Sequence, residues 1–263
     1  MRERDDLTLL ETAVRAAGDI ARKFYGSDFK RWSKEGGSPV TEADLAIDAF
    51  LKQTLLAARP GYGWLSEESV DDPSRLTKER VFVVDPIDGT VAFVKHKPHF
   101  TICAALVEKT QPIAAVVYNP IAGECFTAVT GGGAFLNGEA IHVSDRSSIA
   151  GARMLGPKSN FIGWPEMEIT SYSSIAYRIV TVAAGRHDAI ISLTTKHDWD
   201  LAAADLIVRE AGGLLTDEAG AHLIYNSPAA TQRVCVAAGP VLHRLLLERL
   251  RQKEDSALPF GNG

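Results

Sequence analysis

Four short runs rich in β-branched and aromatic residues follow one another in the middle of the chain, and they restrict the possible folds more than any other feature. They occupy residues 80–85, 100–107, 113–118 and 124–129. Runs of this length, bounded by turn residues, are typical of β-strands. Apolar residues with helical spacing precede them over residues 5–25 and 41–58. We therefore expect two helices followed by a sheet whose strands are mostly antiparallel.

The second half of the chain has a different pattern, in which strand-like and helical segments alternate. Helical spacing is found over residues 173–184, 200–211 and 240–251, and short apolar runs over residues 189–193 and 234–238. Alternation of this kind predicts a mixed sheet flanked by helices. The fold class is therefore α+β or α/β, with an N-terminal α+β subdomain over residues 1–142 and a C-terminal α/β subdomain over residues 143–263.

Composition excludes several classes of protein. The chain is 46% hydrophobic and 23% charged, which is ordinary for a globular protein, and its net charge of −5 disfavours a broad nucleic-acid surface. No apolar run approaches the length of a membrane span. The three cysteines are scattered within apolar runs, and the charged N-terminus does not resemble a secretory signal. We therefore expect reduced, buried thiols and a cytoplasmic protein that has no membrane partner and no strong nucleic-acid signal.

The densest chemical signal is the hexapeptide Asp-Pro-Ile-Asp-Gly-Thr, which follows the first strand-like run. Its proline restricts the backbone, so we expect a sharp turn that directs Asp85, Asp88 and the carbonyl of Ile87 toward one point. Carboxylate and carbonyl oxygens are ligands that Mg²⁺ prefers. The backbone N–H groups of Gly89 and Thr90 then suit a phosphate. The alternative interpretation is an ordinary Asp-Pro turn without a ligand.

Three other segments supply acids that could join this turn. Glu67 and Glu68 follow a short extended run, Asp200 opens a predicted helix after a tryptophan, and Asp44 lies three residues after Thr41. Each also has a simpler interpretation, as a solvated acidic pair or as a helix cap. The four segments occurring together favour a shared metal site.

In this order the segments resemble the inositol monophosphatase family, which comprises Mg²⁺-dependent, lithium-sensitive phosphatases. The family pattern is met by Asp44, Glu67-Glu68, Asp85 to Thr90, Trp199-Asp200 and Gly212-Gly213. The match spans nearly the whole chain. The resemblance implies a layered αβαβα sandwich, a homodimer, and an active site between the two halves that holds two or three Mg²⁺ ions.

The resemblance also implies roles for individual residues. It gives metal-binding roles to Glu67, Asp85, the carbonyl of Ile87, Asp88 and Asp200. It gives catalytic roles in orienting and activating water to Asp44, Thr90 and Glu67. It gives contacts with the substrate and its phosphate to Gly89, Thr90, Asp88 and Asp200. Glu68 is expected to support the shell around the metals.

The expected substrate is a small phosphorylated metabolite, with inositol 1-phosphate as the generic case. The segment 193–198 lacks the glutamate that family members acting on inositol phosphates often carry before Trp-Asp, although Asp198 could replace it. The segment 34–41 resembles the bisphosphate nucleotidase branch, which hydrolyses 3′-phosphoadenosine 5′-phosphate. Lys34 would then contact the substrate, and Arg178 would meet a second phosphate with two parallel hydrogen bonds. The alternative for Arg178 is a solvated helix residue.

Two further possibilities stay open at the level of sequence. One is that the substrate is histidinol phosphate. The other is a role without catalysis, because some bacterial proteins that resemble these enzymes are regulatory partners of the transcription machinery.

The Gly-rich stretch 31–39 is expected to form a lid over the site.

Overall fold

Strand β4 (Arg80–Asp88) shows how the sequence builds two cores around one sheet. Successive side chains of a strand point to opposite faces. Phe82 and Val84 accordingly pack into a core with the N-terminal helices, whereas Val81 and Val83 pack into a second core with helices from the C-terminal half. The strand is buried along its whole length because both of its faces are covered. The computed structural model describes residues 2–33, 39–233 and 235–257.

Seven strands form the larger sheet, in the order β3-β4-β5-β6-β7-β8-β9. Besides β4 they are β3 (Gly63–Ser66), β5 (Thr101–Glu108), β6 (Gln111–Asn119), β7 (Glu124–Val129), β8 (Ala134–Leu136) and β9 (Glu139–Ala140). Only the β3–β4 pair is parallel among the described strands of this sheet. The predicted antiparallel sheet is confirmed.

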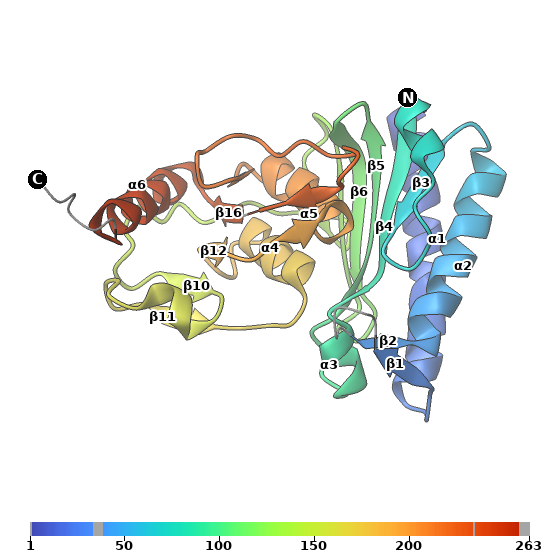
Figure 1. Ribbon diagram of the computed structural model, residues 1–263, viewed down its shortest axis with the longest axis horizontal. Helices are drawn as coiled ribbons and strands as arrows, with labels where there is room; N and C mark the ends of the chain where they lie inside the picture. The colour runs from blue at the N-terminus through green and yellow to red at the C-terminus, as the bar shows by residue number, and fades with distance from the viewer. Residues whose placement is uncertain (1, 34–38, 234, 258–263) are drawn as a thin grey trace, which may run out of the picture.

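Helices cover both faces of this sheet, and a second sheet lies beyond them (Figure 1). Helices α1 (Arg2–Tyr25) and α2 (Glu42–Ala58) cover the outer face, and α4 (Ile175–Ala183) and α5 (Asp198–Glu210) cover the inner face. Five shorter strands form the second sheet, which α6 (Pro240–Ala257) covers from outside. In sheet order these strands are β11 (Glu168–Thr170), β10 (Arg153–Leu155), β12 (Ala189–Ser192), β16 (Cys235–Ala238) and β14 (Leu214–Thr216).

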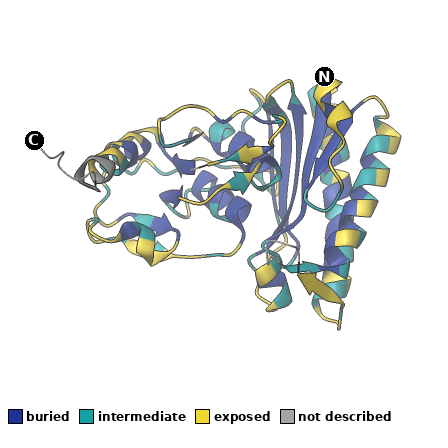
Figure 2. Cartoon of the chain, viewed as in Figure 1, coloured by how far each residue is buried: buried dark blue, intermediate teal, exposed yellow. Residues whose placement is uncertain are grey.

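The resulting layers are helix, sheet, helix, sheet and helix, so the αβαβα sandwich is confirmed. Burial follows this order, with dark strands and inner helices and with exposed residues on the outward sides of α1 and α2 (Figure 2). All three cysteines are buried and free, as predicted. In the described ranges, no helix combines the length and apolar character needed to cross a bilayer. The boundary expected after residue 142 stays a prediction.

Short elements complete the fold. Strands β1 (Arg31–Ser33) and β2 (Pro39–Thr41) pair antiparallel, as do β13 (Lys196–His197) and β15 (Thr231–Gln232), and α3 (Thr90–Val94) follows β4. The stretch 31–39 is not an uninterrupted lid loop as expected, because its two ends pair as β1 and β2. Residues 34–38, which include Lys34 and most of the expected lid, lie outside the described residues.

Candidate metal centre

Three carboxylates meet where β4 ends beside the first turn of α5. Asp85, Asp88 and Asp200 each offer one oxygen, and these oxygens lie within 4.8 Å of one another. Burial and the neighbouring carboxylates raise the pKa of Asp85 well above its usual range. Burial and Asp200 raise the pKa of Asp88 to about 7. Both shifts have the same physical origin, which is like charge concentrated away from water.

A bulge in β4 brings the first two of these acids to the same side. Residues three apart on a regular strand point to opposite faces. Asp85 pairs with Cys103 and Asp88 pairs with Thr101, so β4 carries one extra residue between the two pairs. The missing N–H of Pro86 is tolerated at such a bulge. We expected a turn after the strand here, whereas the strand continues through the proline to Asp88.

The N-terminus of α4 holds Asp88 in place. Its Oδ2 accepts hydrogen bonds of 2.6 Å from the Ser174 hydroxyl and from the Ala176 N–H, and its Oδ1 accepts one of 3.3 Å from the Ile175 N–H. The helix N-terminus also attracts negative charge. Ser174, whose hydroxyl lies 3.1 Å from that of Thr101, was missed at the level of sequence. Its position as the N-cap of a predicted helix was the available signal.

Asp44 and Thr90 form a second hydrogen-bonded unit beside the acids. The hydroxyl of Thr90 lies 3.2 Å from Asp44 Oδ1 and 3.1 Å from the carbonyl oxygen of Ile87. Asp44 Oδ2 accepts a hydrogen bond of 2.8 Å from the Thr41 N–H, which completes a capping box at the start of α2. Burial raises the pKa of Asp44 to about 6 against the lowering effect of these hydrogen bonds. The carboxylate therefore serves as a helix cap and also faces the site.

Gly89 connects β4 to α3 in a conformation that favours glycine. Its φ of 99° lies in the left-handed region, and an added Cβ would lie 3.1 Å from the Ser174 nitrogen and 3.2 Å from the His99 oxygen. A larger residue would therefore separate β4 from the start of α4. Gly89 allows the backbone to approach this helix closely at the edge of the site.

Glu67 follows β3 in a loop that α2 anchors. The hydroxyls of Ser66 and Ser69 donate hydrogen bonds of 2.5 Å and 2.6 Å to the two oxygens of Asp48. Asp48 lies one helical turn after Asp44, so one helix supports both Thr90 and the Glu67 loop. Asp48 was missed because a lone acid in a helix normally faces solvent.

Seven of the predicted site residues line one cavity of about 190 Å³, whereas Asp44 and Arg178 are not among its described lining residues. Its described walls are Pro39, Glu67, Asp85, Ile87, Asp88, Gly89, Thr90, Val91, Ser173 and Asp200. The structure thus brings together residues from β2, the loop after β3, β4, α3, the segment before α4, and α5. Asp200 lies at the third position of α5 and accepts a 2.7 Å hydrogen bond from the His197 N–H, rather than being the first residue of the helix. Glu68 is not among the described lining residues.

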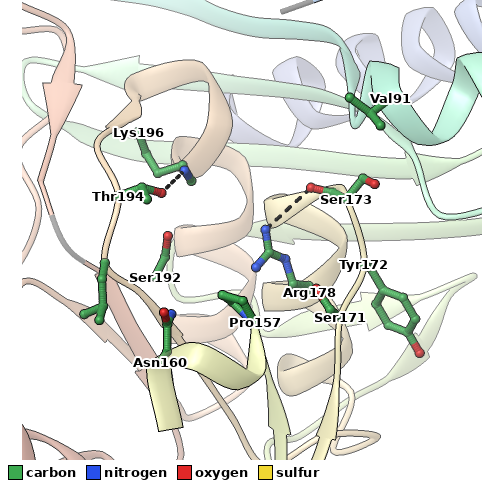
Figure 3. A pocket seen from close by; sticks show the side chains of 11 residues that line it. Val91, Pro157, Asn160, Ser171, Tyr172, Ser173, Arg178, Ser192, Thr194 and Lys196 are labelled. Carbon is green, nitrogen blue, oxygen red and sulfur yellow. Dashed lines mark hydrogen bonds between the residues drawn. The ribbon is translucent and has the colours of Figure 1, made fainter. Parts of the chain in front are cut away.

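A second cavity of about 470 Å³ adjoins the first (Figure 3). Val91 and Ser173 line both cavities, and Arg178 and Lys196 line the second. Arg178 therefore faces a cavity rather than open solvent. Asp198 does not line either cavity, because its buried carboxylate accepts hydrogen bonds from the Asn226 N–H and the Gln232 amide.

The residues present suit magnesium. Every side chain in the cluster offers carboxylate oxygens, and hard cations such as Mg²⁺ prefer oxygen ligands. Buried carboxylates packed this closely repel one another when ionised, so a divalent cation would relieve the repulsion. The cluster could therefore hold a metal ion.

Known proteins resemble this chain along most of its length. A model of the inositol monophosphatase family matches residues 3–255. The chain is 32% identical to the Nus factor SuhB of Salmonella typhimurium, over 96% of this chain and 98% of that protein. It is 34% identical to inositol monophosphatase 2 of Solanum lycopersicum, over 80% of this chain and 86% of that protein. The solved structure of an IMPase from Thermotoga maritima matches with a TM-score of 0.83 at 27% identity, over 96% of this chain and 99% of that chain.

Proposed function

Because the chain belongs to the inositol monophosphatase family and is a phosphatase, we propose that it uses Mg²⁺ to hydrolyse phosphate monoesters of small polyols such as inositol 1-phosphate. The observation that carries the proposal is the convergence of Asp85, Asp88 and Asp200, whose oxygens lie within 4.8 Å of one another. Glu67 and the cluster line a cavity that also includes Gly89 and Thr90.

Two or three Mg²⁺ ions would be held by Glu67, Asp85, the carbonyl of Ile87, Asp88 and Asp200. When bound, the ions would supply Lewis acidity toward water, phosphate and the leaving oxygen. The amides of Gly89 and Thr90 would hold the phosphate, with Asp88 and Asp200 beside the substrate. Lys34 is proposed as a further substrate contact, although it lies outside the described residues.

Thr90 and Asp44 would move a proton away from the attacking water. When Thr90 donates its hydroxyl proton to Asp44 Oδ1, a lone pair of Thr90 Oγ1 is left to accept a hydrogen bond from water. Asp44, with its pKa near 6, is largely ionised at pH 7 and can act as the general base. Glu67 would orient the same water from the opposite loop. Water then adds to phosphorus, the bond from phosphorus to the alcohol oxygen breaks, and the departing alkoxide takes a proton from solvent water, which leaves the alcohol and inorganic phosphate.

We further propose a cytoplasmic homodimer that Li⁺ inhibits. Three buried, free thiols support a reducing compartment. The homodimer and the lithium inhibition rest on family membership. Millimolar Li⁺ is expected to lower the rate by competing for one Mg²⁺ position, and a rate unchanged in excess Li⁺ would count against this part of the proposal.

A Nus-factor role is the second candidate function. It is supported by the 32% identity to the SuhB protein of Salmonella typhimurium. Asp85→Asn separates the two functions, because a regulatory contact would survive the loss of one buried metal ligand whereas hydrolysis would not.

The proposal is tested by phosphate release from a panel of monoesters, each with Mg²⁺ or with EDTA. The panel contains inositol 1-phosphate, 3′-phosphoadenosine 5′-phosphate, histidinol phosphate and β-glycerophosphate, compared by kcat/KM. We expect turnover only with Mg²⁺, and a loss of at least about 10³-fold in Asp85→Asn and Asp88→Asn. The control is Asp19→Asn, which removes an exposed acid from α1. Equal turnover in EDTA or in Asp85→Asn would overturn the proposed function.

A further inference from the structure

A fully buried arginine joins the loop after β3 to the C-terminal half of the chain. Arg75, which is 1% exposed, lies in a 3₁₀ helix, η1 (Pro73–Thr77), between β3 and β4. Its Nε and Nη2 donate hydrogen bonds of 2.6 Å and 3.0 Å to the two carboxylate oxygens of Asp71. Its Nη1 donates one of 2.6 Å to the side-chain oxygen of Asn226, and its Nη2 donates one of 3.0 Å to the Ser227 carbonyl. The guanidinium therefore connects segments that lie 151 residues apart.

The connection continues from Asn226 to the start of α5. The backbone N–H of Asn226 donates a hydrogen bond of 2.7 Å to Asp198 Oδ2, and the Gln232 amide donates one of 2.8 Å to Asp198 Oδ1. Burial raises the pKa of Asp198, whereas its hydrogen bonds and the nearby charge of Arg75 act to lower it. Asp71, Arg75, Asn226 and Asp198 thus form one continuous path, which we call the Arg75 bridge.

Each end of the Arg75 bridge lies close in sequence to a proposed metal ligand. Asp71 follows Glu67 by four residues in the loop after β3, and Asp198 precedes Asp200 by two residues in the first turn of α5. Figure 1 shows α5 in the helical layer beside the sheet that contains β3. Glu67 and Asp200 line the same cavity from these two layers. Because ligands of one metal centre must keep fixed separations, a connection between their segments bears on metal binding.

From this connectivity we infer that Arg75 is a positioning residue for the metal centre, which fixes the Glu67 loop relative to the start of α5 and thereby increases the affinity for divalent cations. The inference rests on the proposed function and adds a determinant of metal affinity that lies outside the described cavity walls. Groups that orient metal ligands commonly control affinity. Asp198, which the sequence suggested as a substrate contact, would then serve to anchor the helix that carries Asp200.

The competing interpretation is that Arg75 only stabilises the fold. Removing any buried arginine leaves its partners unpaired, so stability alone does not separate the two roles. Arg80 provides a matched control, because it is 6% exposed and donates hydrogen bonds of 2.9 Å to Asp6 and of 2.9 Å to Glu108. It is the first residue of β4, whereas Asp88 is the last. Loss of Arg80 should therefore weaken the fold without disturbing the metal centre.

The experiment measures Mn²⁺ binding by electron paramagnetic resonance, together with urea unfolding of the metal-free protein. It compares the wild type with Arg75→Met, Asn226→Gly and Arg80→Met. Methionine keeps an unbranched side chain and removes the guanidinium. Asn226 has a φ of 59°, which glycine adopts readily, so Asn226→Gly removes the side-chain contact and keeps the N–H that binds Asp198. This milder variant tests the Arg75 bridge even if Arg75→Met does not fold. Asp85→Asn identifies the Mn²⁺ signal that belongs to the acidic cluster.

We expect Arg75→Met to raise the dissociation constant of Mn²⁺ by about 10- to 100-fold. Asn226→Gly should raise it by a smaller factor, because Arg75 keeps its hydrogen bonds with Asp71 and Ser227. Arg80→Met should unfold at a lower urea concentration than the wild type and keep the wild-type dissociation constant. A change in Mn²⁺ affinity that does not follow the change in stability distinguishes positioning from support of the fold.

Two results would overturn the inference. One is an unchanged Mn²⁺ dissociation constant in folded Arg75→Met or, if that variant does not fold, in Asn226→Gly. The other is an equal increase in Arg80→Met, which would show that metal affinity follows stability alone. Both results would leave the proposed function intact. A wild type without Mn²⁺ binding that depends on Asp85 would instead refute the proposed function.

Discussion

Replacing Asp44 by asparagine separates its role as a base from its role as a helix cap. An asparagine oxygen can still accept the hydrogen bond from the Thr41 N–H. The asparagine NH₂ group would donate a hydrogen bond to the Thr90 hydroxyl oxygen. The Thr90 hydroxyl would then donate its own proton to the Ile87 carbonyl oxygen, 3.1 Å away. The proposed proton path would be lost although the local fold is kept. We expect kcat to fall by about 10²- to 10⁴-fold.

The same variant is expected to stabilise the metal-free protein at high pH. The pKa of Asp44 rises from 3.8 to about 6 on folding. At about 1.4 kcal/mol per pH unit, this shift lowers the free energy of unfolding by about 3 kcal/mol once the carboxylate is ionised in both states. Between these pH values the native state retains a proton that the unfolded state loses. Stability therefore falls as pH rises through this window, and above pH 6 the ionised carboxylate destabilises the native state. Asp44→Asn removes this destabilising charge.

Urea unfolding in EDTA between pH 4 and pH 8 provides the measurement. Relative to the wild type, Asp44→Asn should gain about 2–3 kcal/mol in the free energy of unfolding at pH 8 and little at pH 4. Glu42→Gln is the control, because it removes a charge from the same helical turn outside the described cavity walls. A loss of stability of equal size at every pH, together with an unchanged kcat, would show that Asp44 is only a helix cap.

Three other predictions test the surroundings of the cluster. Asp48→Asn should weaken the anchoring of the Glu67 loop and raise the Mg²⁺ concentration needed for half-maximal activity; an unchanged Mg²⁺ dependence would exclude that positioning role. Gly89→Ala should cost about 1–3 kcal/mol in urea unfolding because φ is 99°, and a neutral result would mean that the backbone relaxes there. Mg²⁺ should raise Tm more at pH 8 than at pH 5.5, since protonated carboxylates are poor ligands, and a larger increase at pH 5.5 would contradict the assigned ligands.

Sequence patterns predicted the layers because their physical causes are local. The alternation in β4 and the helical spacing in α1 and α2 each depend on neighbouring residues only. The joint orientation of Asp85 and Asp88 depends on more than their hexapeptide. It requires the register with Thr101 and Cys103 on β5, where one extra residue forms the bulge. A motif alone could indicate that the acids act together but not how the sheet directs them.

Residues that act across the fold were harder to identify. Asp48 supports the loop after β3 from a helix, and its hydrogen bonds to Ser66 and Ser69 span 18 and 21 residues. The sequence does not decide whether Arg178 faces solvent or substrate, because its surroundings depend on how α4 packs beside the segment that carries Lys196. Such contacts arise from packing, and a single sequence carries no spacing rule for them.

We propose that the acidic cluster gathers divalent cations beside the cavity that Gly89 and Thr90 line. Anomalous diffraction from crystals soaked in Mn²⁺, a stand-in for Mg²⁺, would locate such ions. We expect an anomalous peak within bonding distance of oxygens from Asp85, Asp88 and Asp200. Ordered Mn²⁺ elsewhere in the crystal with no peak among these three carboxylates would contradict it.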